Sequence, residues 1–106
     1  TFADICITVT PSDRSPFFNM IKHATDDLVE LVIKTDEQVS RRQDAPKVFD
    51  ITTVAYVTTP AFIRQSSGVM TGKVTSVCVP KERAVDIDTQ IDFDFAKLLV
   101  QKMEQQ

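Results

Sequence analysis

The chain has 106 residues, a formal net charge of −3, 42% apolar residues and 25% charged residues. This length suits at most one modest domain, and the composition is that of an ordinary soluble globular protein. The weak negative charge argues against a nucleic-acid-binding surface. No apolar run approaches the roughly 20 residues that span a bilayer, and the first residues show no signal-peptide pattern. Cys6 and Cys78 lie in apolar, β-branched segments, which predicts two reduced core cysteines in a cytoplasmic protein.

The first third of the chain predicts a strand followed by a hairpin. Residues 2–10 are β-branched and nearly continuous, as in a strand buried on both faces, and Pro and Ser in 11–16 end it. Residues 17–35 hold two apolar segments around Asp26 and Asp27, which predicts a β-hairpin that turns there. A helix over 26–34, capped by Asp26, is the alternative. Because the hairpin shows apolar residues on both faces, we expect a partner subunit to cover it.

Residues 35–47 are polar and aperiodic, which predicts a loop. The loop contains Arg41, Arg42 and Lys47, the densest basic group of the chain. A guanidinium group matches a carboxylate or phosphate in two hydrogen bonds, which predicts an anion site. The alternative is a solvated loop with salt bridges to Asp44 or Glu37.

The second half predicts alternating strands and helices. We expect strands at 54–57 and 73–79, a short helix at 60–64 begun by proline, a loop at 65–72, and a helix from just after Thr89 to about Lys102. The long helix carries an apolar stripe at helical spacing: Ile91, Phe95, Leu98, Leu99 and Met103.

An acidic segment at 80–94 joins the last strand to this helix. If the chain is still extended there, Asp86 and Asp88 point to one side while Val85 and Ile87 face the core. Two such carboxylates suit a hard divalent cation such as Mg²⁺, which could also hold nucleotide phosphates. The alternative is that Asp88 or Thr89 caps the helix and the other acids favour its N-terminal end.

Two motifs in order resemble a known family. Residues 84–89, A-V-D-I-D-T, are followed by I-D-F at 91–93, and residues 41–50, R-R-Q-D-A-P-K-V-F-D, are followed by Tyr56 in a short strand. This arrangement is similar to the N-acylneuraminate cytidylyltransferases, the CMP-sialic acid synthetases and their legionaminic acid relatives. The resemblance covers about the last two-thirds of the chain. Thr52-Thr53 stand where many members carry Asn-Gly, which leaves the exact sugar open.

The resemblance implies a fold class and an activity. The fold would be α/β, the C-terminal part of a Rossmann-like nucleotidyltransferase with an inserted β-hairpin dimerisation region. It would form one domain over 1–106, with a dimerisation and sugar-site region over about 17–58, in a homodimer. The activity would be transfer of CMP from CTP to a nonulosonic acid with release of pyrophosphate. Since the chain has only Gly68 and Gly72 and no phosphate-cradling loop, we expect the CTP-gripping segment to be absent from it.

The resemblance also implies site residues. Asp86 and Asp88 would hold Mg²⁺, and Arg41, Arg42, Gln43 and Arg14 would contact the sugar acid, whereas the catalytic base is not assigned. His23 is expected to be an ordinary surface or interface residue. Two alternatives remain: a non-enzymatic dimerisation or interaction domain derived from the family, and a related cytidylyltransferase acting on an octulosonic acid.

Overall fold

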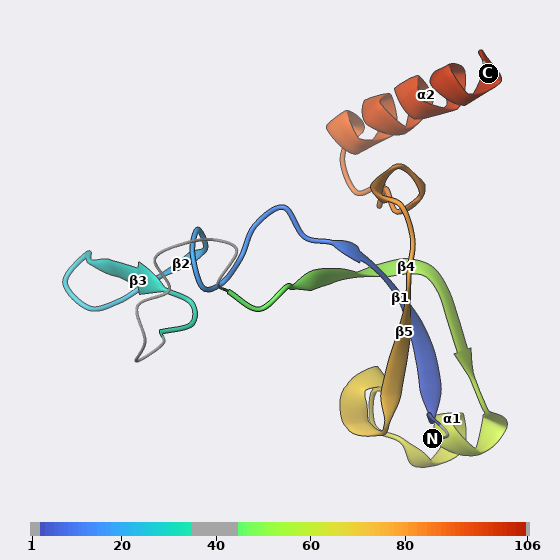
Figure 1. The fold of residues 1–106 in the computed structure, drawn as a ribbon, viewed down its shortest axis with the longest axis horizontal. Helices are drawn as coiled ribbons and strands as arrows, with labels where there is room; N and C mark the ends of the chain where they lie inside the picture. The colour runs from blue at the N-terminus through green and yellow to red at the C-terminus, as the bar shows by residue number, and fades with distance from the viewer. Residues whose placement is uncertain (1–2, 35–44, 106) are drawn as a thin grey trace. The chain divides into compact units, whose positions relative to one another are not determined.

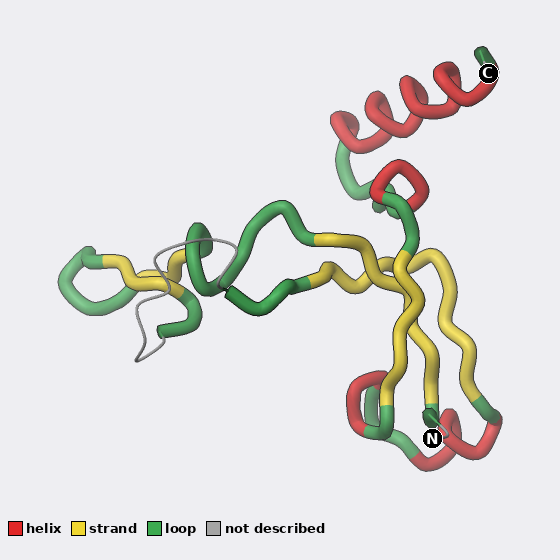
Figure 2. The backbone as a smooth tube through the Cα atoms, viewed as in Figure 1, coloured by secondary structure: helices red, strands yellow, loops and turns green. Residues whose placement is uncertain are grey.

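The computed structural model describes residues 3–34 and 45–105. Five strands and two α-helices occur in these ranges (Figures 1 and 2): β1 Ile5–Pro11, β2 Ile21–His23, β3 Val29–Leu31, β4 Phe49–Thr58, α1 Pro60–Gln65, β5 Val74–Cys78 and α2 Gln90–Glu104. The mixed α/β class is therefore confirmed.

The chain divides into two compact units. The first comprises Thr1–Thr10 with Asp50–Gln106, and we call it the sheet unit; the second, Pro11–Phe49, is the hairpin unit. The expectation of one domain with a dimerisation region over about 17–58 stays a prediction.

The sheet unit is built on three strands in the order β4-β1-β5. β1 and β5 are parallel, in a register that runs from Ile5 opposite Val74 to Val9 opposite Cys78. Towards β4 the contacts run in the opposite direction, since the Thr58 hydroxyl donates to the Asp4 carbonyl and Thr8 lies against Thr52. The first strand is therefore central, as its β-branched sequence predicts.

The core of the sheet unit lies on one side of β1. Ile5, Ile7 and Val9 alternate along the strand and are all buried, with Phe62 and Val74 packed against them. This alternation follows from the two-residue period of a strand. Thr10, at the end of the strand, is also buried, and its hydroxyl has no hydrogen-bond partner in the described part of the chain.

The short helix α1 begins as proline at its first turn predicts. Thr59 precedes Pro60 and accepts a hydrogen bond from the Phe62 amide at 3.2 Å, so the helix has a side-chain N-cap. The loop after α1 contains a short 3-10 turn, Val69–Thr71, that the sequence does not predict.

The hairpin unit has the predicted turn. Asp26 and Asp27 have φ angles of 59° and 61°, in the left-handed region that both central residues of a type I′ turn adopt. The Leu28 amide donates to the Thr25 carbonyl at 3.2 Å and closes the turn. β2 and β3 pair antiparallel, with Lys22 opposite Glu30. The hairpin prediction is confirmed, and the helical alternative is wrong.

The long helix α2 is confirmed, but in the described chain most of its apolar stripe is exposed, and only Leu99 is half-buried. Ile91 is 79% exposed, and Phe95, Leu98 and Met103 are also exposed. Both cysteines are free, as predicted, although Cys78 is exposed rather than part of a core. No helix among the described residues is both long and apolar enough to cross a membrane.

Candidate functional site

The acidic segment follows β5 without continuing it. β5 ends at Cys78, a 3-10 turn occupies Lys81–Arg83, and residues 84–88 belong to no helix or strand. Val85 is half-buried, whereas Ile87 is 53% exposed, so the expectation that both side chains face the core is wrong for Ile87. Pro80 has no amide hydrogen to continue the ladder, so the strand alternation does not carry through to Ile87.

Thr89 begins α2 with a capping box. Its hydroxyl accepts from the Asp92 amide at 3.2 Å, and the Asp92 carboxylate accepts from the amides of Asp88 and Thr89, each at 3.0 Å. The Asp88 amide, then the Thr89 hydroxyl and amide, stabilise the charged form and lower the pKa of Asp92. The capping interpretation is therefore right for Thr89.

The four aspartates of this segment divide into two pairs. Asp92 completes the capping box, and Asp94 accepts a hydrogen bond from the Gln90 side chain at 3.0 Å. Asp86 and Asp88 are exposed, and their carboxylates have no hydrogen bond or ion pair among the described residues. The structure thus separates two acids that build the helix start from two that remain accessible to a ligand.

Accessible carboxylates of this kind suit magnesium chemistry. Mg²⁺ is usually held by one or two carboxylates together with substrate phosphates and water. No cluster of three or more His, Cys, Asp or Glu side chains that could hold a metal occurs in the described part of the chain. Asp86 and Asp88 could therefore contribute to a magnesium site only with further oxygen ligands from a nucleotide, from water or from other residues.

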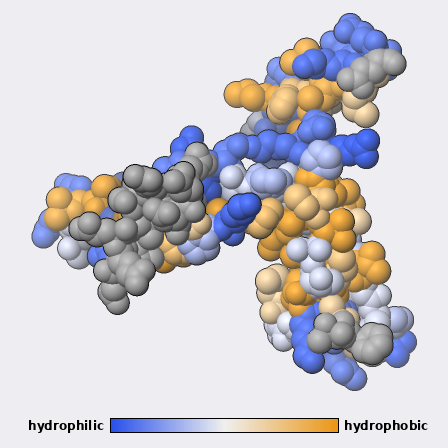
Figure 3. Space-filling model, in the orientation of Figure 1, coloured by the Kyte–Doolittle hydropathy of each residue, from blue (hydrophilic) through white to orange (hydrophobic). Residues whose placement is uncertain are grey.

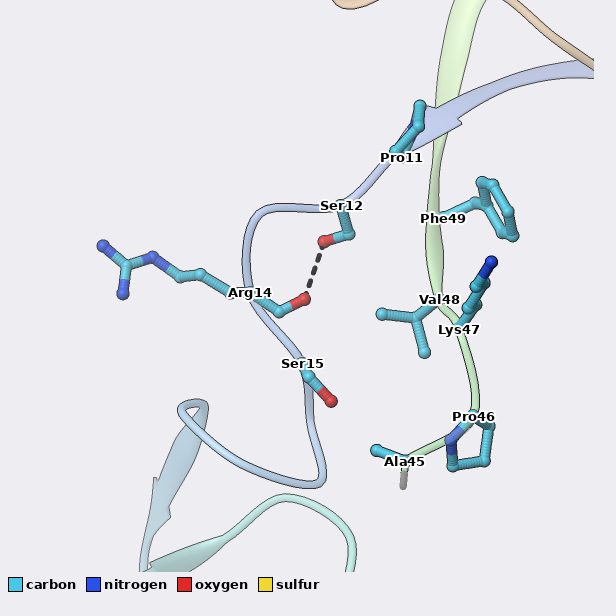
Figure 4. Close-up of a pocket in the computed structure, with 9 residues that line it drawn as sticks. All are labelled: Pro11, Ser12, Arg14, Ser15, Ala45, Pro46, Lys47, Val48 and Phe49. Carbon is cyan, nitrogen blue, oxygen red and sulfur yellow. Dashed lines mark hydrogen bonds between the residues drawn. The ribbon is translucent and has the colours of Figure 1, made fainter. Parts of the chain in front are cut away.

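A cavity of about 690 Å³ lies within the hairpin unit (Figure 4). One wall comes from Pro11, Ser12, Arg14 and Ser15, and the other from residues 45–49. The Ser12 amide donates to the Val48 carbonyl at 3.2 Å and joins the two walls. A second hydrogen bond, from the Ser12 hydroxyl to the Arg14 carbonyl at 2.8 Å, holds the turn in the first wall.

The lining of this cavity is apolar and cationic. Pro46, Val48 and Phe49 supply apolar surface, and Arg14 and Lys47 supply positive charge. None of the described residues that line the cavity is acidic. In Figure 4 the Arg14 guanidinium extends away from the opposite wall, so the two cations do not converge on one point. The cavity can receive an acidic ligand with apolar substituents, with Lys47 as the cation on the second wall.

The predicted sugar-contacting residues have different outcomes. Arg14 lines the cavity. Arg41, Arg42 and Gln43 lie outside the described residues. Lys47, which the sequence marks only as part of a basic loop, is a cavity residue. The run Ala-Pro-Lys before β4 could have indicated this, because a proline favours an extended approach to a strand.

The sheet unit has a smaller hollow of about 420 Å³ beside α1, lined by polar residues that include Asp4 and Thr59. The Asp4 carboxylate already accepts from the Lys73 amide at 2.7 Å. This hydrogen bond ties β1 to the start of β5, so we assign Asp4 a structural role.

No family model matches the chain. It is similar to two curated proteins from Campylobacter. One is the CMP-N,N'-diacetyllegionaminic acid synthase of Campylobacter jejuni, 30% identical over 95 residues, which are 89% of this chain and 39% of that protein. The other is the post-translational flagellin modification protein B of Campylobacter coli, 29% identical over 100 residues, which are 93% of this chain and 41% of that protein.

The chain spans about two fifths of the length of these relatives. The similarity agrees with the two sequence motifs, and the resemblance that they carry is confirmed. Over about nine tenths of its length, the chain is similar to part of a protein named as a CMP-N,N'-diacetyllegionaminic acid synthase.

Proposed function

We propose that this chain is part of a cytidylyltransferase that transfers CMP from CTP to a nonulosonic acid and releases pyrophosphate. The observation that carries the proposal is the similarity, over 89% of the chain, to a protein named as a CMP-N,N'-diacetyllegionaminic acid synthase. In this reaction the anomeric hydroxyl of the sugar acid attacks the α-phosphate of CTP. Positioning and charge neutralisation dominate such chemistry.

Asp86 and Asp88 are the residues that we assign to Mg²⁺. Their exposed carboxylates have no partner in the described chain, and hard oxygen ligands fit this ion. When bound, Mg²⁺ would neutralise the triphosphate and favour departure of pyrophosphate. The protein's own contribution is to hold the two acids next to the rigid capping box of α2.

We assign the cavity of the hairpin unit to the sugar acid. The Lys47 ammonium group can pair with its carboxylate, and the apolar wall can receive its N-acyl groups. Arg41, Arg42 and Gln43, which the family resemblance assigns to the sugar acid, precede this wall in sequence. The apolar residues that the hairpin exposes suit a homodimer contact, and two free cysteines fit a cytoplasmic enzyme.

The test is pyrophosphate release by an assembled protein that contains this chain and a nucleotide-binding portion, supplied with CTP, Mg²⁺ and either N,N'-diacetyllegionaminic acid or N-acetylneuraminic acid. We expect release with at least one of the two sugar acids and none without Mg²⁺. An octulosonic acid in the same assay distinguishes a related cytidylyltransferase. If an assembled protein that contains a nucleotide-binding portion binds CTP yet releases no pyrophosphate with any of these acids, the non-enzymatic interaction domain is the better interpretation.

A further inference from the structure

A buried serine lines the cavity of the hairpin unit. Many apolar side chains of this chain lie at its surface, as Figure 3 shows for the sheet unit, so a polar side chain that is buried is notable. Ser15 is 6% exposed and lines the larger cavity. Thr52 and Thr10 are equally buried, but the Thr52 hydroxyl is hydrogen-bonded to Thr8, and Thr10 lines neither cavity. Ser15 is therefore the buried polar side chain placed to meet a ligand.

The Ser15 hydroxyl has a proton to donate. Its oxygen accepts a hydrogen bond from the Phe17 amide at 3.2 Å, and no described residue accepts its proton. A hydroxyl group can accept and donate at the same time. In Figure 4 this hydroxyl extends from the first wall of the cavity towards the second, and the Val48 side chain extends back towards the first wall. The donor is therefore available inside the cavity.

Asn19 holds Ser15 in this orientation. The Asn19 side-chain oxygen accepts from the Ser15 amide at 2.6 Å. In return, the Ser15 carbonyl accepts from the amides of Phe18 and Asn19 at 3.1 Å and 3.0 Å. The Ile33 amide donates to the Pro16 carbonyl at 3.0 Å and ties this turn to the chain after β3. The backbone that carries the hydroxyl is thus fixed on both sides of Ser15.

The surface opposite Ser15 is apolar, since Ala45, Pro46 and Val48 line the second wall. A donor that faces apolar surface suits a ligand group that joins an acceptor oxygen to a methyl group. An acylamino group has both. A carboxylate has no methyl group and needs a cation when it leaves water, and the Arg14 guanidinium extends away from the second wall. A sugar hydroxyl has no apolar part. The acylamino group fits this end of the cavity best.

We propose that Ser15 is a binding residue for an N-acyl group of the sugar acid. Its hydroxyl donates a hydrogen bond to the acyl carbonyl oxygen, and Val48 contacts the acyl methyl group. Asn19 is a positioning residue, because it acts through Ser15. The inference rests on the proposed function for the assignment of the cavity to the sugar acid, and it adds the substituent that the hairpin unit recognises.

The test is saturation-transfer NMR on an assembled protein that contains this chain and a nucleotide-binding portion, titrated with N,N'-diacetyllegionaminic acid. Saturation of an acyl methyl group is compared with saturation of the ring protons in the same ligand, and the titration gives the Kd. We expect the methyl group to receive more saturation than the ring. Ser15→Ala should raise the Kd about tenfold, the loss of one hydrogen bond, and lower the ratio of methyl to ring saturation.

The chain offers a matched control and a second variant. Ser12 also lines the cavity, but its hydroxyl already donates to the Arg14 carbonyl, so Ser12→Ala should leave the ratio of methyl to ring saturation unchanged. Asn19→Ala should change the ratio and the Kd in the same direction as Ser15→Ala. Asn19→Asp keeps the oxygen that accepts from the Ser15 amide and should restore both values. If circular dichroism shows that Ser15→Ala does not fold, the two Asn19 variants decide.

A methyl group that receives no more saturation than the ring would overturn the proposal, and so would an unchanged ratio in Ser15→Ala. The NMR measurement needs no turnover. A lowered ratio in Ser15→Ala without pyrophosphate release therefore contradicts only the proposed reaction. An unchanged ratio in an active enzyme whose KM for the sugar acid rises in Lys47→Ala contradicts only the Ser15 contact. An assembled protein that binds CTP but not the sugar acid contradicts both.

Discussion

In the sheet unit, Ile5 and Ile7 are about 95% buried against neighbours from distant parts of the chain, whereas in the hairpin unit Ile21, Leu28 and Val29 are all exposed. The hairpin relies instead on local interactions. Its turn places two aspartates at positive φ, and Glu30 pairs with Lys22 across the strands and with Lys34 four residues on. Long-range burial therefore holds one unit, and short-range backbone and charge chemistry holds the other.

The two units also carry opposite charges at their candidate sites. The sheet unit contributes Asp86 and Asp88, which suit a cation, and the hairpin unit contributes Arg14 and Lys47, which suit an anion. The difference suggests a division of labour in which one unit handles the metal-bound nucleotide and the other handles the sugar acid. Substitutions that affect one function and spare the other will test this division.

The largest effect is expected for Asp88→Asn in the active enzyme. Loss of a magnesium ligand should lower turnover on the order of 100-fold or more, because the triphosphate charge is no longer neutralised. The measurement is pyrophosphate release against Mg²⁺ concentration. Asp94→Asn is the control, since Asp94 is engaged with Gln90. Unchanged turnover in Asp88→Asn would contradict the assignment of Asp88 as a magnesium ligand.

Gly72→Ala should destabilise the sheet unit by about 1–3 kcal/mol. A Cβ at this position would lie 2.5 Å from the Asp4 carboxylate and 2.6 Å from the Phe62 ring. The Asp4 carboxylate cannot retreat without losing the Lys73 amide at 2.7 Å. Gly68→Ala, where the nearest atom is 3.7 Å away, is the control. Denaturant unfolding measures the stability of both variants. Equal unfolding midpoints for Gly72→Ala and Gly68→Ala would contradict the prediction, because they would mean that Asp4 and Phe62 move aside without cost.

Lys47→Ala should raise the KM for the sugar acid on the order of tenfold, the loss expected for one charge-assisted hydrogen bond. The KM for CTP should stay the same, because we place the nucleotide at the other unit. Lys97→Ala on α2 is the control. Arg42→Ala is expected to have the same effect as Lys47→Ala, a raised KM for the sugar acid and an unchanged KM for CTP. Equal weakening of sugar and nucleotide binding would contradict the division of labour.

Thr89→Ala should cost about 1 kcal/mol of helix stability through loss of the N-cap, and Thr89→Ser should retain most of it. The lowered pKa of Asp92 also makes the stability of α2 depend on pH, because the charged carboxylate stabilises the capping box. This stabilisation is present above the unfolded value of about 4 and is lost as the pH falls through the lower folded pKa. Circular dichroism between neutral and acid pH measures it, and an Asp92→Asn variant should lack this component.

The smallest effect is expected in the hairpin. Asp27→Gly should stabilise it by about 0.5–1 kcal/mol, because glycine adopts the φ of 61° without a Cβ penalty. Slower hydrogen exchange at the Ala24 and Leu28 amides, which bracket the turn, would show the gain. Asp50→Gly, at an exposed position of β4 in the sheet unit, is the control. Faster exchange in Asp27→Gly would mean that the aspartate side chain supports the turn.

The sequence by itself determined the elements that depend on local chemistry. The β-branched run of β1, the turn at Asp26-Asp27, the proline start of α1 and the Thr89 cap of α2 were all predictable, since each depends on residues within a few positions. The family resemblance could also be inferred, because its two motifs are contiguous stretches. The sequence could not show that Asp92 and Asp94 form hydrogen bonds at the start of α2 while Asp86 and Asp88 stay exposed. The geometry of the cap decides which carboxylate accepts the backbone amides.

Only the tertiary structure decided which distant segments meet. The parallel register of β1 with β5 and the cavity between residues 11–15 and 45–49 join positions more than 30 apart in sequence. Exposure likewise depends on what surrounds a residue rather than on its own type. Ile87, Cys78 and the stripe of α2 have core-like sequences and are nevertheless exposed in this chain, because hydrophobic burial requires a second surface that neighbouring residues do not provide.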